Sequence, residues 1–286
     1  MLQGYGKQVN SVSFSAVGYN MISSSNDNMV RIWDAMSGEQ IQTFKGHRDW
    51  TSCAEFSPDG RKVVTCSWDK TIRLWDVESG NELLQCRGHA KPILSVSFSS
   101  DGKYIVSGSY DETIRLWDVD SGREIKKVIV YSRGVLSVQF SPDCQTIVSS
   151  SNDKIISLWG VKSGKRLKKL KGHSNTVTRA RFSPDGQFIV SCSFDKTIRI
   201  WDVESGKQIK EIKGHSDIVR DVKYFPDGKT IISCSEDKTV RLWDAKSGDE
   251  IQRLKGHSDR VASIAISSDN NFIVSCSVDQ TIQIWR

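Results

Sequence analysis

The five histidines of this 286-residue chain have the residue type and the spacing that could do chemistry. Each follows a glycine and precedes one of a series of regularly spaced aspartates and tryptophans. An imidazole can act as a general base, and imidazoles are common metal ligands. The histidines are His47, His89, His173, His215 and His257.

The motifs that usually accompany such chemistry do not occur in the sequence. It contains no GxSxG, HExxH or P-loop pattern and no zinc-finger spacing. The seven cysteines form no CxxC pair, which argues against a zinc site and against a redox pair. The sequence therefore predicts a protein that is not an enzyme and that needs no metal and no cofactor.

Charge and hydropathy exclude some classes of partner. The net charge of +6 permits an acidic partner but falls short of a dedicated nucleic-acid-binding protein. No apolar run approaches the roughly 18 residues of a membrane helix. The N-terminus, MLQGYGKQVNSV, lacks the apolar core of a secretory signal. We expect a soluble protein of the cytoplasm, the nucleus or both, with no membrane partner.

The elements that must position the histidines belong to a repeat with a period of 42 residues. The phrase DKTIRLWDVESG at residues 69–80 recurs as DKTIRIWDVESG at 195–206, and seven copies follow one another without insertion or deletion. One aspartate recurs in each copy: Asp27, Asp69, Asp111, Asp153, Asp195, Asp237 and Asp279. One tryptophan does the same: Trp33, Trp75, Trp117, Trp159, Trp201, Trp243 and Trp285.

Each copy contains three short β-type runs and a fourth, more polar one. In the second copy these runs are TSCAEF, KVVTCS, TIRLW and ELLQC. The Pro-Asp-Gly at 58–60 separates the first two, since proline presets φ and glycine accepts positive φ. No window has a convincing helical period, so an all-β fold is expected.

A small-residue position in the second run of each copy holds most of the cysteines. Cys66, Cys192, Cys234 and Cys276 occupy it, and the other copies have only serine or glycine there. A position restricted to small residues indicates tight packing, and a free cysteine packs as a small hydrophobe. We therefore expect these cysteines to be buried free thiols.

The period, the Gly-His pairs and the Trp-Asp pairs resemble the WD-repeat family, whose members fold as β-propellers. The resemblance covers the whole chain. It implies a seven-bladed propeller of four-stranded antiparallel blades, formed by residues 1–286 as a single domain. A blade cannot bury both faces alone, which explains why near-identical copies stack around an axis.

The resemblance also implies that the histidines are structural. In such propellers a Gly-His histidine, the turn aspartate, a strand serine or threonine and the tryptophan form a hydrogen-bonded tetrad in each blade. Two serine positions qualify, four and two residues before the aspartate, as in Ser107 and Ser109, and the sequence leaves this open. Tyr5 and Tyr131 replace histidine in two copies, and the fourth copy has Gly160 after its tryptophan.

Positions that differ between the copies are free to serve a function. Three such positions vary most: the residue before the turn aspartate, and the residues three and five after the histidine position. The resemblance places them in loops that share one face, where family members often bind partner peptides. The resulting candidate partner-binding residues are Trp50, Trp68, Leu94, Tyr110, Phe194, Arg220, Glu236 and Arg260.

These candidates predict an aromatic sector on blades two and three and a charged sector on blades six and seven. Aromatic residues and arginine dominate interface hot spots, and exposed aromatic clusters usually mark binding sites. We expect a non-catalytic scaffold that binds proteins or peptides on this face, as a member of a larger complex. The alternative is that the basic run KSGKRLKKLK, residues 162–171, forms a rim that binds nucleic acid or acidic partners.

The last copy lacks most of its outer strand. The chain begins at a position equivalent to Thr43 and stops at one equivalent to Asp34, so only Leu2 and Gln3 are available to close the ring, with Leu2 in the slot of Phe44. The last blade could be incomplete because the chain is shortened or because the blade has three strands. Another chain could also add a strand to the open edge.

Overall fold

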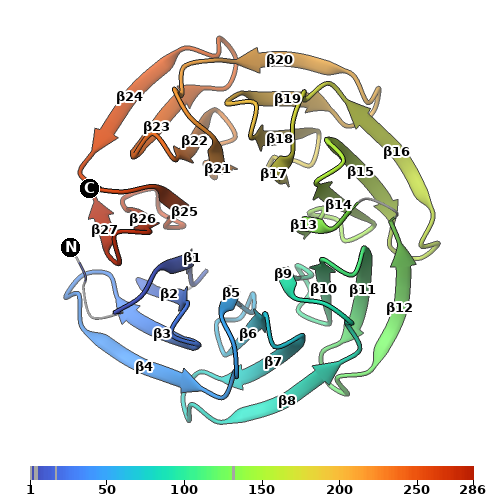
Figure 1. Ribbon diagram of the computed structural model, residues 1–286, viewed down its shortest axis with the longest axis vertical. Coiled ribbons are helices and arrows are strands. Elements are labelled where there is room, and N and C mark those ends of the chain that lie inside the picture. The colour runs from blue at the N-terminus through green and yellow to red at the C-terminus, as the bar shows by residue number, and fades with distance from the viewer. Residues whose placement is uncertain (1, 3–5, 17, 131–132) are drawn as a thin grey trace.

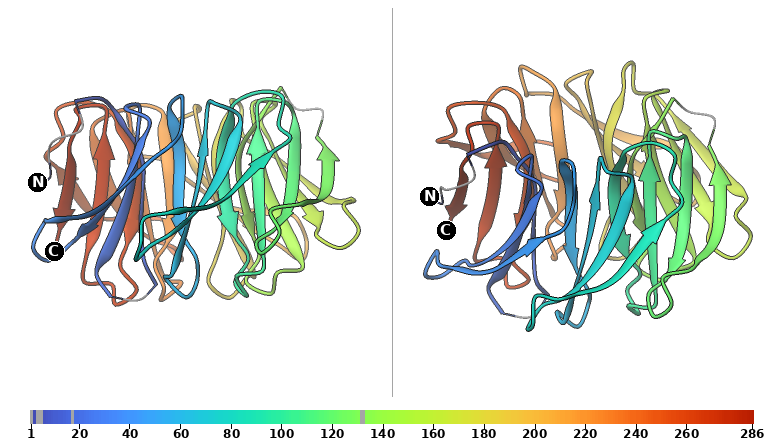
Figure 2. Two further views of the ribbon diagram at one scale, coloured as in Figure 1. Left: turned by 90° about the horizontal axis from the view of Figure 1, so that it is seen from below. Right: turned by 60° about the horizontal axis from the view of Figure 1, so that its bottom comes forward.

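The computed structural model describes residues 2, 6–16, 18–130 and 133–286. These residues form 27 strands in seven antiparallel sheets, and no helix occurs among them. The sheets are arranged radially around a central opening (Figure 1). In the edge view, neighbouring sheets stand side by side around the ring (Figure 2). The predicted all-β, seven-bladed propeller is confirmed.

The first four blades run from strand β1 to strand β16. Blade one is β1 (Val9–Phe14), β2 (Asn20–Ser25), β3 (Met29–Asp34) and β4 (Gln40–Lys45). Blade two is β5 (Thr51–Phe56), β6 (Lys62–Ser67), β7 (Thr71–Asp76) and β8 (Glu82–Arg87). Blade three is β9 (Ile93–Phe98), β10 (Tyr104–Ser109), β11 (Thr113–Asp118) and β12 (Glu124–Ile129). Blade four is β13 (Val135–Phe140), β14 (Thr146–Ser151), β15 (Ile155–Gly160) and β16 (Arg166–Lys171).

The last three blades run from strand β17 to strand β27. Blade five is β17 (Val177–Phe182), β18 (Phe188–Ser193), β19 (Ile198–Asp202) and β20 (Gln208–Ile212). Blade six is β21 (Val219–Tyr224), β22 (Thr230–Ser235), β23 (Thr239–Asp244) and β24 (Glu250–Lys255). Blade seven is β25 (Val261–Ile266), β26 (Ile273–Ser277) and β27 (Ile282–Trp285).

The hydrophobic core lies between blades rather than within them. The cluster between blades one and two joins Ile32 and Phe44 of the first blade to Val63 and Trp75 of the second. The ring centroids of Phe44 and Trp75 are 5.4 Å apart. Because each blade buries its faces only against its neighbours, stability requires the closed array, as the repeat predicted.

The small-residue position of the second strand is as tight as expected. Cys66, Cys192, Cys234 and Cys276 are fully buried, and all seven cysteines of the chain are free. Gly108 occupies the same position in blade three, where an added Cβ would lie 2.7 Å from Cγ1 of Val135. Burial raises the pKa of Cys192 to about 12, so this thiol is inert at neutral pH.

Blade seven has three strands, and among the described residues Leu2 adds one isolated bridge to its outer edge. The backbone N–H of Leu2 donates to Ile282 O at 2.7 Å, and the Ile282 N–H donates back to Leu2 O at 3.0 Å. The same register joins Phe44 to Val30 in blade one, so the predicted equivalence of Leu2 and Phe44 is confirmed. Gln3 lies outside the described residues.

Candidate functional site

The tetrad of blade two shows what the histidines do in this protein. His47 Nδ1 lies 2.9 Å from Asp69 Oδ2, and His47 Nε2 lies 2.7 Å from Thr65 Oγ1. Trp75 Nε1 donates to the same Thr65 oxygen at 2.9 Å. Because an indole N–H can only donate, the threonine proton is left for the histidine, which then donates from Nδ1 to the aspartate. Every polar group of the tetrad is satisfied.

Four further blades repeat this arrangement with serine in place of threonine. The histidine–aspartate distance is 2.8 Å in each of them. The serine is the one four residues before the aspartate: Ser107, Ser191, Ser233 and Ser275. The serine two residues before it has another task, since Ser109 accepts the backbone N–H of Asp111 and donates to the carbonyl oxygen of Lys91.

Burial favours the neutral form of three of the tetrad histidines. Burial lowers the pKa of His89, His173 and His215, although the partner aspartate opposes this effect. Burial alone would raise the pKa of Asp111, but the hydrogen bonds from His89 and Thr113 hold it well below its usual range. A neutral imidazole with both nitrogens bonded inside the protein is not available as a general base. Among the described residues, no group of His, Cys, Asp and Glu has the arrangement of a metal site.

Blade four departs from the pattern. Trp159 Nε1 still donates to Ser149 at 2.8 Å, but Ser157 stands where Arg73 and its equivalents pair with an acidic or amide side chain. Gly160 replaces the aspartate that closes the turn elsewhere. Tyr5 and Tyr131, which replace histidine in blades one and four, lie outside the described residues.

The variable loop positions are paired by one repeated backbone bond. In blade two the N–H of Trp68 donates to Trp50 O at 2.9 Å. The equivalent bond occurs in all seven blades, with lengths from 2.9 to 3.4 Å. The two loops therefore open on one face in every blade, and the side chains at these positions can vary while the backbone stays the same.

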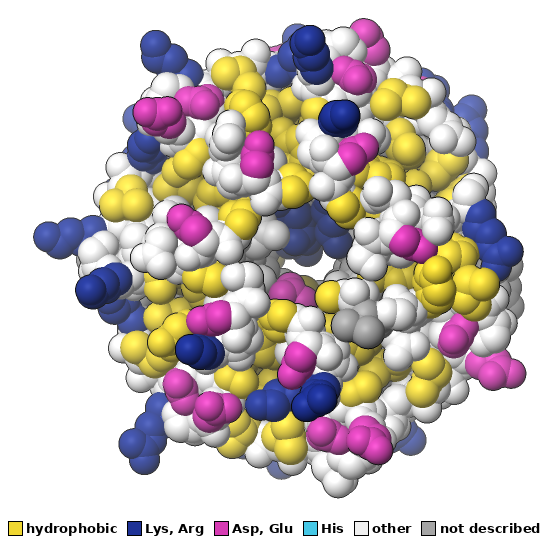
Figure 3. Space-filling model, turned by 180° about the vertical axis from the view of Figure 1, so that it is seen from behind, with side chains coloured by type: hydrophobic (Ala, Val, Ile, Leu, Met, Phe, Trp, Pro, Cys, Tyr) yellow, Lys and Arg dark blue, Asp and Glu magenta, His cyan; other side chains and the backbone are white. Residues whose placement is uncertain are grey.

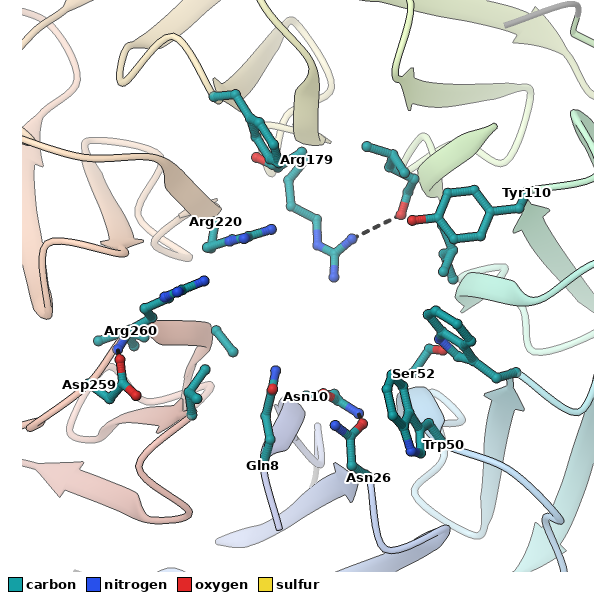
Figure 4. A pocket seen from close by; sticks show the side chains of 18 of the residues that line it. Gln8, Asn10, Asn26, Trp50, Ser52, Tyr110, Arg179, Arg220, Asp259 and Arg260 are labelled. Atoms are coloured by element: carbon teal, nitrogen blue, oxygen red, sulfur yellow. Dashed lines mark hydrogen bonds between the residues drawn. The ribbon is translucent and has the colours of Figure 1, made fainter. Parts of the chain in front are cut away.

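These side chains surround a cavity at the mouth of the central channel (Figure 4). Its volume is about 520 Å³. Seven of the eight predicted partner-binding residues line it, namely Trp50, Trp68, Leu94, Tyr110, Phe194, Arg220 and Arg260. Glu236 does not line it, because its carboxylate pairs with the guanidinium of Arg220 and lies 3.6 Å from that of Arg260.

One side of the cavity is aromatic. The ring centroids of Trp50 and Trp68 lie 4.9 Å apart, and Trp68 meets Tyr110 of the next blade edge-on at 6.3 Å. Trp50 and Trp68 are among the few exposed large hydrophobic side chains, at 41% and 36% of full exposure. This row of contacting rings joins blades two and three.

The opposite side carries arginines. Arg220 stacks on the ring of Phe194 with a distance of 5.1 Å to the ring centroid, and Arg260 is more than half exposed. Figure 4 shows a third arginine, Arg179, reaching toward the middle of the mouth. Its Nη1 donates to the carbonyl oxygen of Leu136 at 3.0 Å.

Sequence comparison of three loop positions missed Arg179, which lies one residue further along. The register shifts between Val177 and Arg179, so this β-bulge lets neighbouring residues reach the channel in a way that strict alternation does not predict. A signal was present, because five of the other copies have only Ser or Cys at this position, as in Ser137 and Cys53. Asp259, which also lines the cavity, was missed as well.

Charged side chains continue down the channel below the mouth. Asp221 is fully buried and accepts from the hydroxyl of Ser263 at 2.8 Å, with Arg179 and Arg181 at 3.8 and 3.6 Å. Burial lowers the pKa of Lys223 to about 8, and burial raises the pKa of Glu55. The view from behind shows basic and acidic atoms inside the central opening (Figure 3).

The basic run on the outer strand of blade four is partly committed to structure. The ammonium of Lys168 donates to the carbonyl oxygens of Val203, at 2.6 Å, and Glu204 in the next blade. Lys126 and Lys210 make equivalent bonds from blades three and five. These three lysines connect neighbouring blades around the rim, so Lys168 of the predicted basic rim has a structural contact.

Comparison with known families agrees with this geometry. The family model described as WD domain, G-beta repeat (WD40) matches residues 1–34, 38–76, 80–118, 123–160, 164–202, 206–244 and 248–286. A comparison with curated proteins found no match. No helix in the described part of the chain is long and apolar enough to cross a membrane. With seven matched repeats along its length, the chain belongs to the WD40 repeat family.

Proposed function

We propose that this protein is a non-catalytic scaffold that binds a partner peptide or protein at the mouth of the channel. WD40 propellers generally act as protein-interaction scaffolds and are typically not enzymes. The observation that carries the proposal for this chain is the row Trp50, Trp68 and Tyr110 at the edge of a cavity of about 520 Å³.

Physical chemistry supports binding at this row. Exposed aromatic side chains that contact one another offer a large apolar area at little entropic cost, which is the usual composition of an interface hot spot. The repeated backbone bond between the two loops holds these side chains on a rigid base. The candidate residues Leu94, Phe194, Arg220 and Arg260 would extend the contact around the mouth, and Glu236 would orient the two arginines.

The free thiols fit a reducing compartment, so we place the protein in the cytoplasm or the nucleus as part of a larger complex.

Affinity purification with mass spectrometry tests the proposal. The wild type is compared with the double variant Trp68→Ala/Tyr110→Ala, which should keep its melting temperature and lose the partners bound at the mouth. A matched control, Leu167→Ala, removes an exposed apolar side chain from the outer rim. A partner set that is unchanged in the double variant would move the binding site away from the channel mouth.

The rim of blade four gives a second candidate, in which basic side chains bind nucleic acid or an acidic partner. Arg166 and Lys169 are exposed there and carry the observation that favours it. The candidate is weakened because Lys168 is bonded to the next blade, and Arg166 lies over the ring of Trp159 at 5.3 Å. Binding that falls steeply with salt and that Trp68→Ala does not affect would support the rim.

A further inference from the structure

Arg179 occupies a position in the ring that is otherwise reserved for small or acidic side chains. The equivalent residues are Ser11, Cys53, Ser95, Ser137, Asp221 and Ser263. A single long cation therefore enters the channel mouth at this level, from blade five. Nothing in the repeated architecture requires it, since five blades hold a small side chain at the same place.

Several N–H donors of the Arg179 guanidinium make no hydrogen bond to the described residues. A guanidinium carries five N–H donors, and Nη1 uses one of them on the carbonyl oxygen of Leu136. The Nε of Arg179 is buried and has no hydrogen-bond partner among the described residues. Because this Nε is buried, a ligand at the mouth does not reach it, and the remaining N–H groups on Nη1 and Nη2 are the donors that a bound acceptor can use.

Asp221 holds the charge in place without satisfying it. Its carboxylate lies 3.8 Å from Nε of Arg179, beyond hydrogen-bond length, and its oxygens accept from Ser263 and from the backbone of Val222 and Ile264. The carboxylate therefore stabilises the guanidinium electrostatically, and the remaining N–H groups on Nη1 and Nη2 are left for a ligand at the mouth, toward which Arg179 extends (Figure 4).

The arginines beside Arg179 strengthen the positive side of the cavity. Arg220 is partly offset by its pair with Glu236, whereas Arg260 lies 3.6 Å from the same carboxylate and is more than half exposed. A ligand group here would therefore meet the guanidinium of Arg179 and the nearby exposed guanidinium of Arg260. A lysine or arginine side chain entering the mouth would meet like charge, which disfavours its binding.

We propose that the channel mouth selects peptides that carry an anionic oxygen group, a carboxylate or a phosphate monoester, next to an apolar or aromatic residue. The anionic group binds Arg179, with help from Arg260, and the apolar residue packs on Trp50, Trp68 and Tyr110. This inference rests on the proposed function, because it specifies the ligand of the same site. Bidentate geometry suits both anions, since arginine matches carboxylate and phosphate alike.

An oriented peptide library tests the selection. The full chain is immobilised and exposed to synthetic peptides with degenerate flanks and one fixed central residue: glutamate, phosphoserine, alanine or lysine. Bound peptides are identified by mass spectrometry, and fluorescence polarisation then measures the affinity of single peptides. We expect the glutamate or phosphoserine pool to be enriched, with an aromatic or aliphatic residue preferred nearby, and the lysine pool to be depleted. The relative enrichment of the two anionic pools tells which source is preferred.

Two variants assign the effect to Arg179. Arg179→Gln should weaken the acidic peptide about tenfold or more and leave an alanine-centred peptide unchanged, because one charge-assisted contact is lost. Arg179→Lys should retain part of the acidic preference. Lys207→Gln removes the same charge from an exposed position that does not line the cavity and should change nothing.

The outcomes separate this inference from the proposed function. Enrichment of lysine-centred or uncharged peptides, or an acidic preference that survives in Arg179→Gln, would overturn the inference and keep the proposed function. If no pool binds, the inference fails, and affinity purification with Trp68→Ala/Tyr110→Ala decides the proposed function separately. If Arg179→Gln does not fold, the wild-type enrichment together with Arg179→Lys decides, since an acidic preference unaffected by Arg179→Lys would also overturn the assignment.

Discussion

The backbone N–H of Trp68 donates to the carbonyl oxygen of Trp50 at 2.9 Å, and the two indole rings contact each other above this bond. The same backbone bond recurs in every blade, whatever the side chains are. The fold is therefore carried by backbone geometry at these positions, and the side chains are left to determine what the face binds. Substitutions here should separate binding from stability.

Replacing Trp68 and Tyr110 together by alanine should lower the free energy of unfolding by no more than about 2 kcal/mol, because Trp68 is 36% exposed, Tyr110 is half-buried and neither is among the buried core residues. Urea unfolding followed by circular dichroism measures this. A loss of several kcal/mol would mean that the aromatic row is part of the core rather than a binding surface.

Replacing Ser107 by alanine should destabilise the protein by about 2 to 4 kcal/mol, since the Nε2 of His89 and the Nε1 of Trp117 would both be left without their partner. The shift in the urea midpoint measures the effect. Ser121→Ala is the matched control, because it removes a serine hydroxyl from an exposed turn. Equal effects of the two substitutions would show that the tetrad hydrogen bonds contribute no more to stability than the hydrogen bond of an exposed turn.

Acidification should destabilise the fold in two stages. Burial lowers the pKa of His89, His173 and His215 in the folded protein, so below the unfolded value of about 6.5 the unfolded chain binds more protons and stability falls with pH. The depressed pKa values of Asp111 and its equivalents add a further loss as pH falls below about 4.

Calorimetry between pH 8 and pH 3.5 measures this dependence. We expect a melting temperature that is flat above pH 7 and that then declines. His89→Gln should flatten the first stage, since it removes one of the titrating groups. A melting temperature that rises as the pH falls from 7 to 5 would contradict the neutral tetrad histidines.

Replacing Gly108 by alanine should cost about 1 to 3 kcal/mol through overpacking, because the new Cβ would lie 2.7 Å from Cγ1 of Val135 in the next blade. Cys66→Ala is the matched control, since that position already accepts a Cβ. Thermal unfolding compares the two variants. If alanine is tolerated at Gly108 as well as at Cys66, Val135 and its strand can shift enough to accommodate the added Cβ.

Supplying the outer strand of blade seven should raise the melting temperature. The strand β27 pairs on one side with β26, and on the other side only Leu2 contacts it among the described residues. A second copy of the segment AKSGDEIQ, residues 245–252, would be appended after Arg286 and would pair along the rest of this edge. A proline-containing version of the same length is the control. Equal melting temperatures for the two proteins would contradict the idea that the added segment pairs with β27 and closes the ring.

The sequence alone determined the propeller and most of the candidate site. A fixed period with Trp75, Asp69 and their equivalents predicts strands and turns because these depend on residues close together in the chain, whereas the tetrads were implied by the resemblance to the WD-repeat family. The variable positions could be identified because seven copies serve as internal controls for what the fold requires. The slot of Leu2 in blade seven followed from the same register.

Only the tertiary structure decided how the copies meet. Ring closure brings Trp68 of blade two against Tyr110 of blade three and carries Lys168 to the backbone of blade five, and neither contact is encoded in a single repeat. The choice of Ser107 over Ser109 required the position of the indole nitrogen. Arg179 reaches the channel through a β-bulge, which changes the direction of side chains without changing the sequence period. Contacts between repeats depend on how the blades pack in three dimensions, and the pattern of residue types along the sequence does not specify that packing.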